Sequence, residues 1–230
     1  MISIQIPFLL QAPDDDRQLT FHRILNEPWK SGATSCSAEF RIAHLNDALL
    51  LKFKVKEPFL KAKKRKNNDA VHLDNCVEFF LAFPGDESYY NFEFNCLGAV
   101  KAAYGKGRNY RKYLADEVLN RISNNLSLSI NNLYDDRKIC WELSVILNMD
   151  MFSFHQYSSF AGLKCTGNFT KCGEKLPQPH FLTWSDSLAE KPDFHRIEFF
   201  GKIDFSPLPV GFQSNKNITL LNPQAKLHET

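Results

Sequence analysis

Two glutamates, Glu78 and Glu93, have the types and spacing in this sequence that most directly suggest chemistry. Each lies in a stretch where apolar and polar residues alternate, residues 75–81 and 89–97, and turn-forming residues separate the two stretches. Alternation interrupted by such a turn predicts a β-hairpin. Matching the apolar faces of the two strands fixes the register to within two residues, and the simplest register places Glu78 directly opposite Glu93 and Cys76 opposite Asn95. A slip of two residues would offset the two acids diagonally.

Two carboxylates in direct cross-strand contact destabilise a sheet unless something compensates their charges. An arginine, a bound cation, a shared proton or a ligand rich in hydroxyl donors would do so. A carboxylate accepts hydrogen bonds from two sugar hydroxyls, and an asparagine both donates and accepts. We therefore expect Glu78, Glu93 and Asn95 to lie on an exposed face suited to a polyol. The alternative is a solvated sheet face without a ligand.

A second group of polar and aromatic residues lies between residues 167 and 205. It contains His180, Trp184, Asp193, His195 and Arg196, in loops of the kind that carry binding residues when strands anchor them. Trp184 fits either a ring that stacks on a sugar or a core residue. Asp193 fits either an ion pair with Arg196 or a hydrogen bond within its own loop.

The histidines and cysteines do not predict a metal site. His72, His180 and His195 could be combined as ligands, but their spacing is not that of a zinc site, so structural roles are favoured. The six cysteines form no CxxC pair, which favours free thiols in a reducing compartment over disulfides.

The elements that must position these residues are mostly strands. Apolar and polar residues alternate in residues 49–56, 126–131 and 139–145, and shorter candidates are residues 39–44, 164–171 and 197–205. Helical spacing is confined to residues 113–123 and 149–157. The pattern predicts an all-β antiparallel β-sandwich with one or two short helical insertions. We expect a single domain over residues 1–205 and an irregular C-terminal extension over residues 206–230.

Overall composition restricts the partners. A net charge of +2 over 230 residues gives no reason to expect a nucleic acid or a membrane surface. No stretch reaches the roughly 18 consecutive apolar residues of a membrane span, and the apolar start lacks the basic residue of a signal peptide. A cytoplasmic protein is expected if the numbering covers the full chain. The oligomeric state is left open.

Several of these segments resemble family 9 carbohydrate-binding modules. Residues 71–81, VHLDNCVEFFL, are similar to the family's D-x-x-V-E-x-F-hydrophobic strand, and residues 91–95 to the strand that follows it. Residues 38–57 fit an early strand of the family. Residues 167–184 and 192–201 resemble a bacterial branch often found as free-standing proteins. The likeness covers most of residues 25–205.

The resemblance implies a β-sandwich that binds sugars between two stacking aromatic residues with polar residues beneath. Glu78 and Glu93 would lie in the polar floor, Trp184 would form one wall, and His72 stands where the sugar-binding members have a tryptophan. The family often holds calcium, which the resemblance allows here, but no loop of this sequence repeats a calcium-binding pattern, so no cofactor is expected. The complete set of predicted carbohydrate-binding residues is His72, Asp74, Glu78, Glu93, Asn95, Arg108, His180, Trp184, His195 and Arg196.

The function expected is therefore a non-catalytic module that recognises mono- or oligosaccharides. One alternative is a retaining glycoside hydrolase, because opposed strand residues would hold the Glu78 and Glu93 carboxyl groups about 5 Å apart. An open sheet face offers no burial to raise one pKa, which makes the enzyme the weaker hypothesis. Another alternative is a haem-binding relative using Met149, Met151 or a histidine, although no spacing selects these residues.

Overall fold

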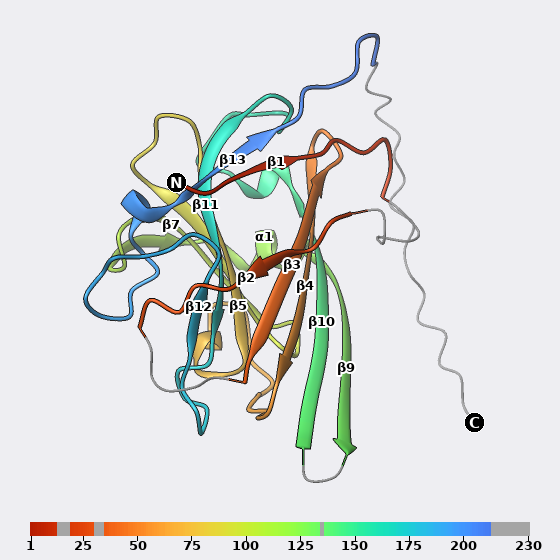
Figure 1. Cartoon of the computed structure of the whole chain (residues 1–230). Coiled ribbons are helices and arrows are strands. Elements are labelled where there is room, and N and C mark those ends of the chain that lie inside the picture. Colours follow the sequence, from red (N-terminus) through yellow and green to blue (C-terminus); the bar gives the residue numbers. More distant parts are fainter. Residues whose placement is uncertain (13–18, 30–34, 134–135, 213–230) are drawn as a thin grey trace.

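The computed structural model describes residues 1–12, 19–29, 35–133 and 136–212 (Figure 1). Within these residues the chain forms two β-sheets packed as a sandwich, which confirms the predicted fold class. Part of the predicted C-terminal extension, residues 213–230, lies outside the described residues. No helix in the described part of the chain is long and apolar enough to cross a bilayer.

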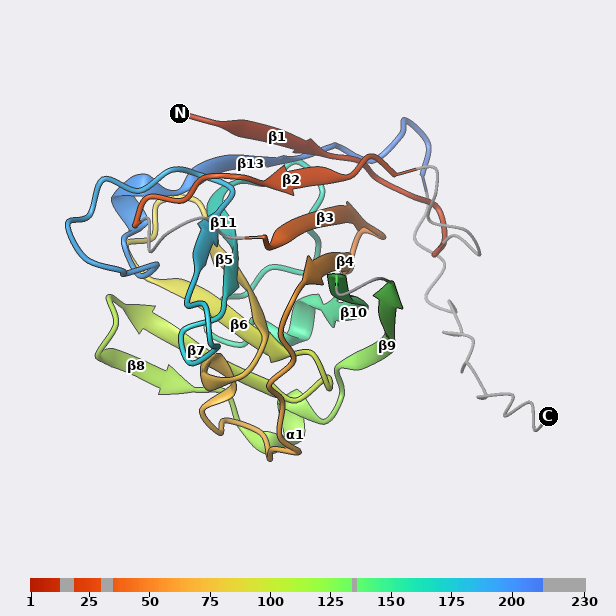
Figure 2. The same cartoon turned by 60° about the horizontal axis from the view of Figure 1, so that its bottom comes forward.

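The sheet that contains the predicted hairpin is called the hairpin sheet here. Its strand order is β1-β13-β11-β5-β6-β7-β8, and β12 pairs with β11 (Figure 2). Its pairings are antiparallel except for the parallel pair β1 and β13. The bounds are β1 (Ser3–Ile6), β5 (Cys76–Ala82), β6 (Tyr89–Asn95), β7 (Val100–Lys106), β8 (Tyr110–Tyr113), β11 (Lys164–Cys172), β12 (Phe181–Thr183) and β13 (Gly201–Phe205).

The second sheet is antiparallel throughout and has the order β2-β3-β4-β10-β9. Its strands are β2 (His22–Ile24), β3 (Ser37–His44), β4 (Ala48–Glu57), β9 (Ser123–Leu133) and β10 (Asp136–Asn148). The helical elements are α1 (Asp116–Leu119) and the 3-10 turns η2 (Val71–Leu73), η3 (Met149–Met151) and η4 (Ile197–Phe199).

The helical segments are short. The predicted helix over residues 113–123 is reduced to the single turn α1, because Tyr113 ends β8 and Ser123 begins β9. Residues 149–157, expected to form one or two helical turns, contain the 3-10 turn η3. Its methionines, Met149 and Met151, are buried in the core cluster, so the haem alternative gains no exposed ligand from them.

Aromatic side chains fill the space between the two sheets. The ring of Phe40 in β3 stacks on that of Phe169 in β11 with centroids 3.6 Å apart, and Phe79 in β5 stacks on Phe169 at 5.0 Å. Trp141 of β10 is 1% exposed. The alternating apolar residues therefore form the inner face of each sheet, and the two inner faces pack against each other.

The opposite face of the hairpin sheet is also covered, so the expectation that Glu78 and Glu93 lie on an exposed face is wrong. Their side chains are 4% and 3% exposed, and β5 and β6 are buried at every position. Distant chain segments fold over this face: Phe200 packs against Phe80 and Tyr89, and Val71 packs against Cys76 and Cys172. A period of two in the sequence cannot reveal such a cover.

A buried ion pair joins the two sheets. Glu57, the last residue of β4, lies 3.0 Å from the Lys171 ammonium of β11, and both side chains are 0% exposed. Glu57 Oε1 also accepts a hydrogen bond from Trp141 Nε1 at 2.7 Å. Lys171 Nζ donates to the Cys172 carbonyl at 2.9 Å. Burial acts against the charged form of Lys171, but Glu57 outweighs it and raises the pKa of the ammonium.

The variant Glu57→Gln should lower the free energy of unfolding by about 3–5 kcal/mol, because it leaves the Lys171 charge buried without a counter-charge. Urea denaturation measures this. The matched control is Glu142→Gln, which breaks the partly exposed pair with Lys52 and should cost less than about 1 kcal/mol. Equal losses in the two variants would contradict the assigned role. Combining Glu57→Leu with Lys171→Met should recover most of the loss.

Candidate ligand-binding site

Four side chains form one row across four strands on the covered face of the hairpin sheet. Glu78 lies directly opposite Glu93, as the sequence predicts. Thr170 of β11 continues the row beyond Glu78, and Lys101 of β7 continues it beyond Glu93. The register thus places a cation next to one of the two carboxylates and a neutral hydroxyl next to the other.

Glu93 is the charged member of the glutamate pair. Its Oε1 lies 3.0 Å from Lys101 Nζ, and its Oε2 lies 3.6 Å from His72 Nδ1. Burial acts against the charged form, but the His72 ring and the Lys101 ammonium outweigh it and hold the pKa of Glu93 below its usual value. Oε2 is nevertheless buried and accepts no hydrogen bond from any described residue.

Glu78 is the protonated member. Its Oε2 accepts a hydrogen bond of 3.1 Å from Asn91 Nδ2, a neutral donor. Burial, together with the neighbouring charge of Glu93, raises the pKa of Glu78 to about 8. At neutral pH the two glutamates therefore hold one proton and one negative charge between them, which relieves their repulsion.

A second polar network flanks the glutamate pair. Arg111 of β8 donates from Nη2 to Asn91 Oδ1 at 3.0 Å, and its Nη1 lies 3.2 Å from His195 Nδ1. Because a guanidinium can only donate, His195 Nδ1 is the acceptor and its proton sits on Nε2. Burial, together with the charge of Arg111, lowers the pKa of His195 to about 3, so this imidazole is neutral.

A cavity of about 540 Å³ opens over these groups. Its polar lining carries both signs of charge, and the rings of Tyr113, Phe181 and Phe194 also line it. Phe194 is supported from behind by Trp29, with ring centroids 5.6 Å apart. The lining residues are His72, Glu78, Glu93, Lys101, Ala103, Arg108, Asn109, Arg111, Tyr113, Cys172, Glu174, Phe181, Pro192, Asp193, Phe194 and His195.

Half of the residues predicted from the sequence come together here. His72, Glu78, Glu93, Arg108 and His195 line the cavity. The remaining five are not part of its lining: Asp74, Asn95, His180, Trp184 and Arg196.

Asp74 and Asn95 hold loops in place instead of facing a ligand. The Asp74 carboxylate is 0% exposed and accepts hydrogen bonds from Arg65 Nε and Nη2 at 2.6 and 2.8 Å. Asn95 donates to Asp74 at 2.9 Å and accepts from the backbone amides of Leu97 and Ala99. Their hydrogen-bonding groups are thus already used by the protein.

Trp184 is a core residue, the second of the two roles open to it. Its side chain is 4% exposed, and its ring meets Phe40 and Phe169 edge-on at 6.0 and 5.6 Å. Stacking on a sugar needs an exposed ring face, which Trp184 does not have. Trp184 therefore does not form the wall that the resemblance assigned to it.

His180 and Arg196 also lie elsewhere. Arg196 forms a surface pair with Glu198 at 2.6 Å. Asp193 Oδ1 accepts a hydrogen bond from the His195 amide at 3.0 Å, so the loop hydrogen bond is formed. His180 lies in the buried cluster around Glu57.

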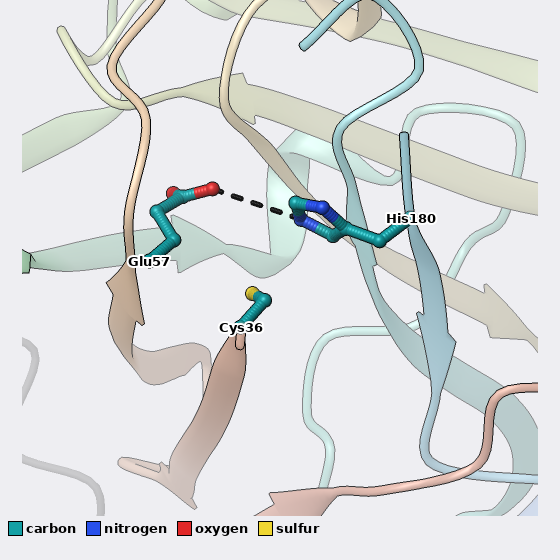
Figure 3. Close-up of side chains that lie close together, drawn as sticks. All are labelled: Cys36, Glu57 and His180. Atoms are coloured by element: carbon teal, nitrogen blue, oxygen red, sulfur yellow. Dashed lines mark ion pairs between the residues drawn. The ribbon is translucent and has the colours of Figure 1, made fainter. Parts of the chain in front are cut away.

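That cluster also brings together Cys36, Glu57 and His180, whose ligand atoms lie within 4.8 Å of one another (Figure 3). A metal ion would compete with Lys171, whose ammonium lies 3.0 Å from Glu57 Oε2 and 3.1 Å from His180 Nε2. Burial, helped by the Lys171 charge, lowers the pKa of His180 to about 4. A lysine cation thus already balances this carboxylate, and the cluster has the character of a structural ion pair. Calcium, which prefers oxygen ligands, stays a prediction from the family resemblance.

Sequence reasoning found Arg108 but missed Lys101, Arg111 and the aromatic rings of the cavity. Lys101 could have been found by extending the alternation into residues 100–106, since it follows Glu93 in the next strand. Arg111 and Tyr113 lie on the short strand β8, which has too few residues to show a period. Phe194 lies in a loop, where no periodic signal exists.

Comparison with known proteins identifies relatives of this chain. The model of carbohydrate-binding family 9 matches residues 8–205. A search of curated proteins found no match.

Three solved structures are similar. A candidate carbohydrate-binding protein from Bacteroides uniformis is 32% identical, with a TM-score of 0.80, and the match covers 89% of this chain and 99% of that one. A family 9 module from Caldicellulosiruptor kristjanssonii in complex with glucose is 13% identical, with a TM-score of 0.60 and coverage of 92% and 100%. The same organism's family 9 module in complex with cellotriose is 14% identical, with a TM-score of 0.57 and coverage of 94% and 99%.

The raised pKa of Glu78 predicts a measurable pH dependence of stability. Between pH 4.5 and about 8 the unfolded chain has released the Glu78 proton and the folded chain retains it. The free energy of unfolding should therefore fall as pH rises through this range, by up to about 1.4 kcal/mol per pH unit. Glu78→Gln, which has no proton to lose, should lack this component in urea denaturation at pH 5, 6, 7 and 8. Identical pH profiles for the two proteins would contradict the buried, protonated state.

Proposed function

The chain belongs to carbohydrate-binding family 9, and we propose that it is a non-catalytic module that binds mono- or oligosaccharides in the cavity over Glu78 and Glu93. One observation carries the proposal: Glu93 lines the cavity, and its buried Oε2 accepts no hydrogen bond from a described residue, since its neighbour His72 Nδ1 lies 3.6 Å away. An unsatisfied buried carboxylate oxygen is costly, and a donor brought by a ligand removes that cost.

The chemistry of the floor favours a ligand rich in hydroxyl groups. A hydroxyl can donate to Glu93 and accept from Lys101, Arg108 or Asn109, which lie in the same lining. Lys101 already contacts Glu93, and Glu174 and Asp193 add negative charge to the lining. Because both signs of charge are present, a neutral polyol suits the cavity better than a strongly charged ligand.

In this proposal other aromatic side chains, not Trp184, stack on the sugar. Phe194, which is half-buried and backed by Trp29, would offer one ring face, and Tyr113, 60% exposed on β8, would offer another. Aromatic faces bury the apolar side of a sugar ring. His72 would contribute to the floor through its contact with Glu93.

The relatives support the ligand class. Two similar family 9 modules were solved with glucose and with cellotriose. At 13% and 14% identity they share the fold with this chain, so the sugar itself is carried over here as part of the proposal.

Isothermal titration calorimetry with glucose, galactose, mannose, xylose and cello-oligosaccharides tests this function. We expect a Kd between micromolar and millimolar for at least one of them, since desolvation offsets much of the hydroxyl contacts. Glu93→Gln and Phe194→Ala should each weaken binding about tenfold, which is about 1.4 kcal/mol. Arg196→Gln, outside the cavity lining, is the control and should bind as the native chain does. No heat with any sugar, or equal loss in the control, would overturn the assignment.

A second candidate function is a retaining glycoside hydrolase, and burial of the glutamate pair favours it. The structure separates the two pKa values: Glu78 is raised to about 8 and Glu93 is lowered. A protonated acid beside a carboxylate is the arrangement in which one group protonates the leaving oxygen and the other attacks the anomeric carbon. Burial thus supplies the pKa shift that an exposed face would not.

Aryl glycosides separate the two candidates. For a binding module we expect no hydrolysis above the buffer rate by the native chain, although the corresponding free sugars bind. Turnover that disappears in both Glu78→Gln and Glu93→Gln but persists in Arg196→Gln would establish the hydrolase instead.

A further inference from the structure

β9 is an unusually unprotected edge of the second sheet. It pairs with β10 on one side, and no described strand pairs with it on the other. Its eleven residues, SNNLSLSINNL, include no charged residue, glycine or proline. Proteins normally keep edges short or charged so that they do not pair with another chain.

The other edge strands do have such protection. β1 and β8 are four residues long, and β2 and β12 are three residues long. β8 carries Arg111 and Lys112, and β2 carries Arg23. Short length, helped by charge in β2 and β8, thus protects the other described edge strands, whereas β9 is long and uncharged. Figure 1 shows β9 as a long outer strand beside β10.

The sequence of β9 is nearly symmetric about Leu128. Reading outward from this residue, both directions give a serine, then a branched aliphatic residue, then two asparagines. Two antiparallel copies centred on Leu128 would therefore place like residues opposite each other. The opposed pairs would be Leu128 with Leu128, Ser127 with Ser129, Leu126 with Ile130, Asn125 with Asn131, and Asn124 with Asn132.

The exposed side chains of β9 fit the same arrangement. Leu126 and Leu128 pair with the buried Leu143 and Trp141 of β10 and are themselves only partly buried. Ile130, on the same face, is 42% exposed. The apolar layer of the sandwich thus ends at this edge on side chains that a second β9 would cover. Ser127 and Ser129 are exposed on the other face, where hydroxyls can pair across strands.

We propose that β9 is a dimerisation edge, on which a second copy of the chain adds its own β9 antiparallel about Leu128. A two-fold axis through the Leu128 pair then joins the second sheets of both copies into one continuous sheet. A two-fold interface is formed by the same surface of each subunit, so a self-complementary strand satisfies it by itself. A charged peptide would find no counter-charge on β9, whereas a second β9 brings an uncharged edge with matching side chains.

Sedimentation velocity of the full chain over a concentration series tests the proposal. Two double variants at residues 127 and 129 test whether the two β9 strands pair about Leu128. Ser127→Lys/Ser129→Lys would place lysines opposite each other at two positions and should weaken the dimer at least tenfold. Ser127→Lys/Ser129→Glu would place lysine opposite glutamate at the same positions and should dimerise as well as the native chain or better. Within one copy, residue 127 lies beside Glu142 of β10, so a lysine there is compatible with the fold.

Thermal unfolding followed by circular dichroism shows whether both variants fold as the native chain does. A native chain that stays monomeric up to its solubility limit would overturn the proposal. A dimer that both variants form equally well would place the interface elsewhere and would also overturn it.

Discussion

Two carboxylates buried directly opposite each other are the constraint around which the ligand site is organised. At 4% and 3% exposure, Glu78 and Glu93 have little water to screen their repulsion. The protein resolves this asymmetrically. Lys101 and His72 keep Glu93 charged, whereas Glu78 receives only a neutral amide and keeps its proton. The cation on one side and the neutral hydroxyl of Thr170 on the other follow from the order of the four strands.

The cover over this face is what turns a sheet surface into a cavity. Phe200 and Val71 pack onto the apolar positions around the glutamates, but the charged row itself is left facing a space of about 540 Å³. Apolar contacts therefore fix the covering segments, and the polar row prevents them from closing completely, because each closed contact would leave a charge unsolvated. Phe181 and Phe194 belong both to the walls of the site and to the cover of the sheet, since they pack against the covering clusters and also line the cavity.

The two faces of the hairpin sheet thus do different work. One face meets the second sheet through stacked phenylalanines, and Glu57 with Lys171 joins the two sheets by a fully buried ion pair. The other face carries the candidate site. Phe79 and Glu78 are neighbours in β5, so the strand that packs into the core through Phe79 also carries the floor of the cavity.

Alternation in the sequence by itself determined the sandwich class and the hairpin, and it restricted the pairing of Glu78 with Glu93 to registers that differ by two residues. It could do so because side chains alternate with a period of two, so that only even shifts keep the apolar face toward the core. Whether the polar face is open or covered, and whether Trp184 points into the core or into the site, was decided only by the tertiary structure. Both depend on contacts between segments far apart in the chain, such as Trp184 with Phe40 and Phe200 with Phe80. Local periodicity carries no information about such contacts. The contacts of Glu93 with His72 and Lys101, also set by the tertiary structure, decided that Glu78 is the glutamate that keeps its proton.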